Sequence, residues 1–159
     1  METLIAYCTK HGATEKAAKS LAEKIEGNTT LINLKESSAK SIDLTKFDTI
    51  AVGGSIYAGS IQKEVQEFCR ENEELLITKN LGIFICCGNE ELAEDQLSTS
   101  FKGKIYDLAT AKGYFGYEFD FEKLNFLSRF VVKKVSKVKE SKFRINEENI
   151  HAFAKALQG

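Results

Sequence analysis

A short loop containing hydroxyl groups and glycine has the residue types that can hold a phosphate group. It lies between an apolar run over residues 4–8 and a helical pattern over residues 15–26. The first backbone N–H groups of a helix have no intrahelical partner and lie at the positive end of the helix dipole, so a phosphate placed there accepts their hydrogen bonds. The loop consists of Thr9, Lys10, His11, Gly12, Ala13 and Thr14.

The composition of this loop separates it from the commoner phosphate loops. A Walker loop has two glycines flanking four residues and then Lys followed by Ser or Thr, and a dinucleotide fingerprint has three glycines at set positions. The loop has the single glycine Gly12, so it suits one terminal monophosphate, to which Thr9 and Thr14 can donate from their hydroxyls. An ordinary strand–helix turn, in which Thr14 caps the helix, is the alternative interpretation.

Alternating strand and helix patterns predict the elements that position this loop. Several of the strand patterns are continuous apolar runs, which is typical of parallel strands buried on both faces. The alternation indicates a doubly wound α/β domain with a parallel sheet and helices on both faces. The polar stretch 35–46 is either a loop or a short helix, and the helical pattern over 92–112 is interrupted near Thr99–Ser100 or Gly103. Strands are predicted at 3–8, 29–34, 47–56, 81–87 and 114–121, and helices at 14–25, 61–73, 92–112 and 146–157.

Two further loops follow predicted strands at the edge of the sheet where ligands bind. In open parallel sheets that edge lies beyond the carboxyl ends of the strands, where the strand order reverses. The residues expected beside the phosphate loop are Ser55, Ile56, Tyr57, Ala58 and Gly59 after the third strand, and Cys87, Gly88 and Asn89 after the fourth. Tyr57 either stacks on a planar ligand or covers the core as an amphipathic loop residue.

The bulk composition predicts one globular domain over residues 1–159. Hydrophobic residues make up 43% of the chain and charged residues 28%, which excludes a disordered protein. No apolar run is long enough to cross a bilayer, and the chain starts on a strand pattern instead of a signal peptide. We therefore expect a cytoplasmic location. No linker, repeat or low-complexity segment divides the chain.

The four cysteines, Cys8, Cys69, Cys86 and Cys87, have no spacing typical of a zinc site, and we predict no metal site. In a reducing cytosol they stay thiols, and the simplest interpretation is that they are small buried hydrophobic residues. The Cys86-Cys87 pair falls at the end of a predicted strand. One of the two is therefore a candidate to line the site.

Positive charge is concentrated in one segment of a chain whose net charge is −1. Between Lys123 and Arg144 there are eight basic residues and one acid, a balance of +7 that leaves −8 for the rest. Apolar residues at three- and four-residue steps over Lys123–Val138 predict a basic amphipathic helix within an insertion at about 122–144. Such a helix either contacts an anionic membrane surface or a partner, or packs its apolar face on the sheet. This local charge does not indicate nucleic-acid binding.

The three strand exits together resemble those of the flavodoxin family. The matching segments are 9–14, 53–59 and 87–89. The resemblance implies a flavodoxin-like fold with a five-stranded parallel sheet in the order 2-1-3-4-5, and FMN as the cofactor. It implies that the loop at 9–14 binds the FMN phosphate, with positive charge available from Lys10 and His11, and that Tyr57 stacks on one face of the flavin ring.

The resemblance also implies roles for backbone groups around the flavin ring. Those of Ile56, Ala58 and Gly59 should face the N5 edge of the ring, and those of Gly88 and Asn89 the pyrimidine edge. No aromatic residue follows the fourth strand over residues 87–91. We therefore expect the second face of the ring to be open to a substrate.

Within this family the chain most resembles the flavodoxin-like, menaquinone-dependent protoporphyrinogen oxidases. The resemblance is carried by the Gly-x-Ser-Ile strand exit at 53–56, the helix segment 65–68 and the basic, aromatic segment 123–134. It implies an FMN enzyme that passes electrons to menaquinone at the inner face of the membrane, as an alternative to an electron carrier that docks a redox partner protein. A scaffold that has lost its cofactor is a third interpretation. No acid–base or nucleophile set is predicted, because the flavin would supply the chemistry.

Overall fold

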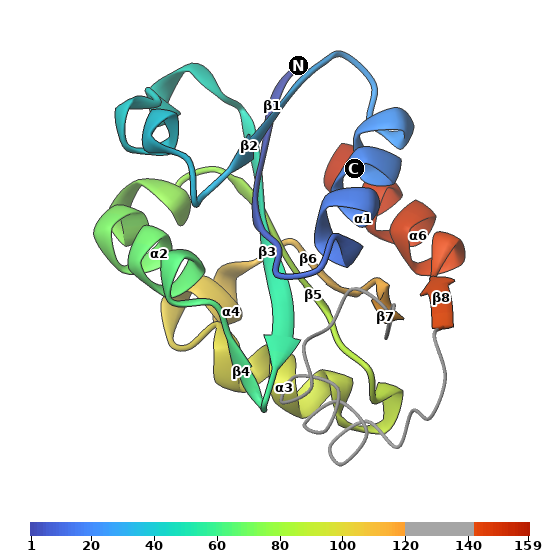
Figure 1. The fold of residues 1–159 in the computed structure, drawn as a ribbon. Coiled ribbons are helices and arrows are strands. Elements are labelled where there is room, and N and C mark those ends of the chain that lie inside the picture. Colours follow the sequence, from blue (N-terminus) through green and yellow to red (C-terminus); the bar gives the residue numbers. More distant parts are fainter. Residues whose placement is uncertain (120–141) are drawn as a thin grey trace.

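Five parallel strands form the centre of the fold, in the order β2-β1-β3-β5-β6 (Figure 1). They are seen in a computed structural model that describes residues 1–119 and 142–159. The predicted order 2-1-3-4-5 is confirmed, since β5 and β6 are the fourth and fifth parallel strands. A short sixth strand, β4 (Ser60–Ile61), pairs antiparallel with the end of β3. The parallel strands are β1 (Glu2–Cys8), β2 (Asn28–Asn33), β3 (Thr49–Tyr57), β5 (Asn80–Cys86) and β6 (Ala111–Tyr114).

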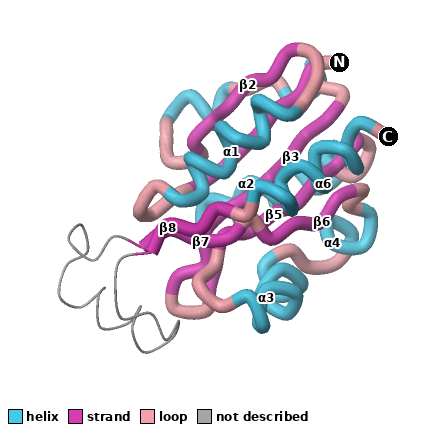
Figure 2. The backbone as a smooth tube through the Cα atoms, turned by 90° about the vertical axis from the view of Figure 1, so that its right-hand side faces the viewer, coloured by secondary structure: helices cyan, strands magenta, loops and turns pink. Residues whose placement is uncertain are grey.

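Helices cover both faces of this sheet, as Figures 1 and 2 show. One face carries α1 (Ala13–Lys24) and α6 (Glu147–Gln158), which pack beside each other. The other carries α2 (Lys63–Leu76), α3 (Ala93–Ser100) and α4 (Lys104–Leu108). The connections include three short 3-10 helices, η1 (Ser37–Ser41), η2 (Leu44–Lys46) and η3 (Glu90–Leu92). The polar stretch over 35–46 is thus helical only in short turns.

The continuous apolar strands build two hydrophobic cores, one on each face of the sheet. Along β1, Leu4 and Ala6 face the core beneath α2, whereas Ile5 and Tyr7 face the core beneath α1. Successive side chains of a strand point to opposite faces, so a strand covered on both sides must be apolar at nearly every position. This double burial fixes the carboxyl ends of the strands, from which the site loops extend.

The predicted last strand over 114–121 and the predicted helix over 92–112 are wrong in their bounds. The predicted interruption near Thr99–Ser100 or Gly103 is confirmed: α3 ends at Ser100, Phe101 is buried in extended backbone, and Gly103, with a φ of 63°, is the N-cap of α4. The parallel strand β6 then begins at Ala111. Gly116, with a φ of 84°, redirects the chain into β7 (Gly116–Phe119), which pairs antiparallel with β8 (Lys142–Ile145).

The predicted basic insertion at about 122–144 falls mostly outside the described residues. Its last residues, from Lys142, belong to β8. The predicted amphipathic helix over Lys123–Val138 lies wholly outside the residues that the structure describes. No described helix has the length and apolar character needed to cross a membrane.

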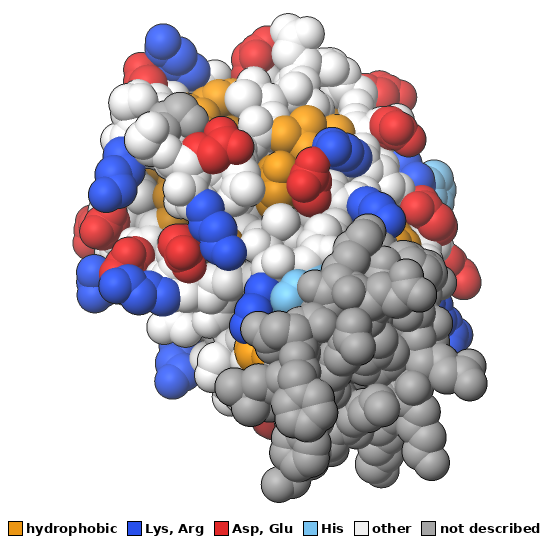
Figure 3. Space-filling view, in the orientation of Figure 1, with side chains coloured by type: hydrophobic (Ala, Val, Ile, Leu, Met, Phe, Trp, Pro, Cys, Tyr) orange, Lys and Arg blue, Asp and Glu red, His pale blue; other side chains and the backbone are white. Residues whose placement is uncertain are grey.

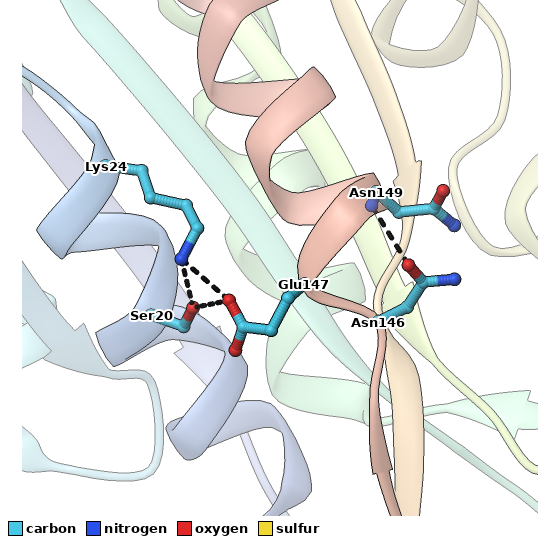
Figure 4. Close-up of polar contacts among 5 residues, drawn as sticks. All are labelled: Ser20, Lys24, Asn146, Glu147 and Asn149. Carbon is cyan, nitrogen blue, oxygen red and sulfur yellow. Dashed lines mark hydrogen bonds and ion pairs between the residues drawn. The ribbon is translucent and has the colours of Figure 1, made fainter.

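A polar cluster joins the start of α6 to the end of α1 (Figure 4). The Lys24 ammonium group lies 2.7 Å from a Glu147 carboxylate oxygen, which also accepts a 2.7 Å hydrogen bond from Ser20. The predicted N-cap of the last helix is confirmed, because the Asn146 side chain accepts the Asn149 N–H at 3.0 Å. The contacts of Glu147 with Ser20 and Lys24 hold the C-terminal end of α1 beside α6.

We expect Gly53→Ala to destabilise the protein strongly. A Cβ at this β3 position would lie 2.3 Å from a ring atom of Phe84, which packs between Gly53 and the rings of Phe115 and Phe153. Overpacking of a buried aromatic cluster costs about 1–3 kcal/mol or more. Urea unfolding followed by circular dichroism measures the loss, with the exposed Ala152→Ser as the control. A Gly53→Ala variant within about 0.5 kcal/mol of the wild type would contradict this packing.

Candidate functional site

The loop between β1 and α1 leaves the start of the helix open. Gly12 is the N-cap of α1, with a φ of 100°, and no side chain of residues 1–119 or 142–159 caps the first turn. Its N–H donates instead to the Thr9 hydroxyl oxygen at 2.9 Å, which closes the loop on itself. The alternative interpretation, in which Thr14 caps the helix, is wrong, because Thr14 lies inside the first turn and is fully buried.

Two buried polar atoms at this end of α1 have no hydrogen-bond partner among the described residues. They are the Thr14 hydroxyl oxygen and His11 Nε2. The neighbour of the Thr14 hydroxyl is the Cys86 thiol, which is a weak hydrogen-bonding group. An unsatisfied buried polar group costs about 1–3 kcal/mol. The free N–H groups of a helix start and the Thr14 hydroxyl are groups that can donate to an acceptor placed there.

A tight hairpin shapes the second loop. Tyr57 and Ser60 pair across it, and the two residues between them, Ala58 and Gly59, have φ values of 49° and 79°. Positive φ at both central residues is the requirement of a type I′ hairpin turn. This turn explains why α2 begins at Lys63, two residues later than predicted.

Gln62 fixes the end of β3 just before this hairpin. Its side-chain oxygen accepts the Ser55 N–H at 3.0 Å, and its side-chain amide donates to the Ser55 hydroxyl oxygen. Sequence reasoning missed this residue. The signal available was its position after a two-residue turn, which places it opposite Ser55 across the hairpin.

The first and second loops meet through their side chains. The Lys10 ammonium nitrogen lies 3.1 Å from the centroid of the Tyr57 ring, and the His11 ring approaches the same tyrosine at 6.0 Å between centroids. Lys10 is exposed and Tyr57 is half-buried. The expectation that these two strand exits converge therefore agrees with the geometry.

The third loop uses much of its backbone for internal hydrogen bonds. The Cys87 N–H donates to the Gly116 carbonyl at 3.1 Å, and the Cys87 carbonyl accepts the Tyr114 O–H at 3.4 Å. The Asn89 side chain accepts the Glu91 N–H and so caps η3. Of the predicted residues in this loop, Gly88 and Asn89 are half-buried and Cys87 is buried.

A small cavity lies where the three loops meet. Sequence reasoning missed Tyr117, whereas Cys86 belongs to the cysteine pair of which one member was a candidate to line the site. Tyr117 enters from β7, so an aromatic residue from outside 87–91 also lines this cavity. Among the predicted residues, Gly12, Thr14, Ala58, Gly59, Gly88 and Asn89 do not line the cavity. The lining residues are Thr9, Lys10, His11, Ala13, Ser55, Ile56, Tyr57, Cys86, Cys87 and Tyr117.

Burial sets the protonation of the titratable groups at this cavity. It lowers the pKa of His11 from the usual 6.5, and the positive charges of Lys10 and Lys35 lower it further. Burial raises the pKa of the Cys86 thiol to about 12 and that of the Cys87 thiol to about 11. Both cysteines are therefore neutral thiols at pH 7 and poor nucleophiles. Among the described residues, no group of His, Cys, Asp and Glu side chains could hold a metal ion.

Solved structures share the fold over nearly the whole chain. A short-chain flavodoxin associated with a non-canonical PDU bacterial microcompartment matches with a TM-score of 0.61 and 15% identity, over 99% of this chain and 97% of that one. The Fusobacterium nucleatum flavodoxin bound to flavin mononucleotide matches with a TM-score of 0.53 and 10% identity, over 99% and 96%. At these identities the likeness shows the fold alone.

A longer enzyme contains the same fold as one part. The rubredoxin oxygen:oxidoreductase of Desulfovibrio gigas matches with a TM-score of 0.61 and 15% identity, over 99% of this chain. The present chain spans only 36% of the length of that enzyme.

Sequence comparison identifies the family but not an individual relative. No functionally curated protein matches the sequence significantly. The sequence model of the flavodoxin domain family matches residues 4–146, which include all three site loops. The chain therefore belongs to the flavodoxin domain family.

Proposed function

We propose that this protein binds FMN and transfers electrons as a flavodoxin-type redox protein. The observation that carries the proposal is the open N-terminus of α1, where the buried Thr14 hydroxyl has only the weakly hydrogen-bonding Cys86 thiol beside it among the described residues. A monophosphate accepts hydrogen bonds from free helix N–H groups and from such a hydroxyl. The ligand thus supplies an acceptor for these groups.

The surroundings of this helix end fit a phosphate in shape and charge. A Cβ built on Gly12 would meet no atom of the described residues within 4 Å, so none of these residues fills the space in front of the loop. Lys10 and His11 flank it, and the unpartnered Nε2 of His11 is a second atom that a phosphate oxygen can satisfy. Because His11 is neutral in the free protein, Lys10 supplies the fixed positive charge.

The cavity has two aromatic residues that can stack on a planar ring. Tyr57 comes from β3 and Tyr117 from β7, and both line the same cavity. We assign Tyr57 to one face of the flavin ring and Tyr117 to the other, with backbone groups of the hairpin at Ala58 and Gly59 along one edge. The bound flavin supplies the electron-transfer chemistry, and the protein holds the ring and limits its contact with water.

The structure carries no observation that favours the oxidase alternative. Of the three segments that carry this resemblance, the basic segment 123–134 lies outside the described residues. On the face shown in Figure 3, the described acidic and basic side chains are interspersed, so this face identifies no partner by charge. A protein redox partner is our proposal. Menaquinone, a membrane contact through Lys123–Val138 and the cytoplasmic location stay predictions.

The first test is whether the purified protein takes up FMN. We expect one FMN per chain, seen as quenching of flavin fluorescence during titration, because Tyr57 would stack on the ring and the helix end would hold the phosphate. Bovine serum albumin at the same concentration serves as a control for unspecific quenching. A protein that leaves the FMN fluorescence unchanged would overturn the proposed function.

Thr14→Val should change cofactor affinity and stability in opposite directions. Loss of a hydrogen bond to the charged phosphate costs about 1.5–3 kcal/mol, so FMN affinity should fall about tenfold or more. The free protein should unfold at equal or higher urea concentration, because an unsatisfied buried hydroxyl is removed. Thr3→Val is the matched control: Thr3 is also fully buried and unpartnered, but lies at the other end of β1. Equal FMN affinity in Thr14→Val and wild type would place the phosphate elsewhere.

The His11 imidazole should titrate differently with and without FMN. In the free protein its pKa lies below 6.5, so the unfolded chain binds the proton more tightly and the protein loses stability as the pH falls below about 6.5. A phosphate beside the ring favours the charged imidazole and should raise this pKa. NMR titration of the His11 ring measures both values, with the imidazole resonance assigned by its loss in His11→Gln. If FMN leaves the His11 pKa unchanged, the phosphate does not lie beside the His11 ring.

A further inference from the structure

Lys10 and Tyr57 form a cation–π pair across the mouth of the cavity. The Lys10 ammonium nitrogen lies 3.1 Å from the ring centroid, and the two residues come from different loops, before α1 and at the end of β3. Lys10 makes no ion pair with a carboxylate among the described residues. Its charge therefore faces the electron-rich ring.

This contact and a stacked flavin compete for the same face of Tyr57. A ring that stacks on a tyrosine needs the space directly above the centroid, which the ammonium group occupies. Any flavin that stacks on this face must first displace Lys10. His11 approaches the same tyrosine at 6.0 Å between ring centroids and 63° between ring planes, farther from the ring centre than the Lys10 ammonium nitrogen.

We propose that Lys10 selects phosphorylated flavins by leaving the Tyr57 ring for the phosphate of the incoming ligand. This inference rests on the proposed FMN binding and assigns its selectivity to one residue. Lys10 lies two positions before Gly12, the N-cap of the helix end assigned to the phosphate. Its flexible four-carbon stem lets the ammonium group move between the ring and the helix end while the backbone stays in place.

The selectivity follows from the contacts that Lys10 loses and gains with each of the two flavins. FMN breaks the cation–π contact and replaces it with a charge-assisted contact between Lys10 and the phosphate. Riboflavin breaks the same contact and offers Lys10 no anion in return. Lys10 therefore weakens the binding of riboflavin and strengthens the binding of FMN.

Lys10→Met tests this inference by its opposite effects on the two flavins. Riboflavin no longer has to break the cation–π contact in this variant. Because such a contact of an exposed lysine is weak, riboflavin should bind about two- to fivefold more tightly to the variant. FMN should bind more weakly at low ionic strength, so the ratio of the two affinities should fall about tenfold or more. Lys112→Met is the matched control, because Lys112 also lies over a tyrosine, Tyr106, at 4.9 Å and on an edge strand.

A second variant isolates the contact itself. In a Tyr57→Leu background, Lys10→Met should leave riboflavin affinity unchanged, because the ring that holds the cation is absent.

In the free wild-type protein, the Lys10 side-chain methylene protons should be shifted upfield by the Tyr57 ring, and FMN should remove this shift.

The outcomes separate this inference from the proposed function. A wild type that binds FMN, with a Lys10→Met variant that keeps the wild-type ratio of FMN to riboflavin affinity, overturns the inference and leaves the function standing. Unshifted Lys10 methylene protons in the free protein overturn it without any ligand. A wild type that binds neither flavin overturns both.

Discussion

The unused hydrogen-bonding capacity at the start of α1 is the constraint on which the site depends. A helix normally satisfies its first N–H groups with a side-chain cap, and here Gly12 takes the cap position without one. The helix tolerates this because its buried face, with Ala17, Ala18 and Leu21, is held against the sheet and its far end is joined to α6. Tertiary packing thus stabilises a helix whose N-terminus stays open for an anion.

The sheet order brings the rest of the site to this helix end. The chain crosses from one side of β1 to the other between β2 and β3, so the crevice lies between the carboxyl ends of β1 and β3. Lys10 and Tyr57 extend from these two ends and meet across the crevice. The type I′ hairpin and Gln62 hold the second end in place, so the tyrosine is presented by a fixed backbone.

The sequence predicted the parts of the fold that follow from local pattern. Continuous apolar runs such as residues 4–8 and 81–87 identified the buried strands, and hydroxyl and glycine residues identified the loops beyond them. The fifth strand was misplaced because Ala111-Lys112-Gly113-Tyr114 has no apolar run and becomes a strand only by pairing with β5. Its pairing is a tertiary property that local pattern does not contain.

The features of the site that the sequence did not predict also depend on tertiary contacts. Tyr117 reaches the cavity because β7 pairs with β8, which is more than twenty residues away in the chain. The contact between Lys10 and Tyr57 joins residues 47 positions apart, and an exposed lysine carries no sequence signal for its partner. Thr14 was identified correctly as a residue of the helix start, but its burial without a partner depends on how α1 packs against β5.

A crystal structure of the protein with bound FMN tests the central claim most directly. The account predicts the phosphate at the first turn of α1, within hydrogen-bond distance of the Thr14 hydroxyl, and the flavin ring on Tyr57 in the place that Lys10 now holds. A phosphate bound away from the start of α1, with the Thr14 hydroxyl still unpartnered, would contradict it.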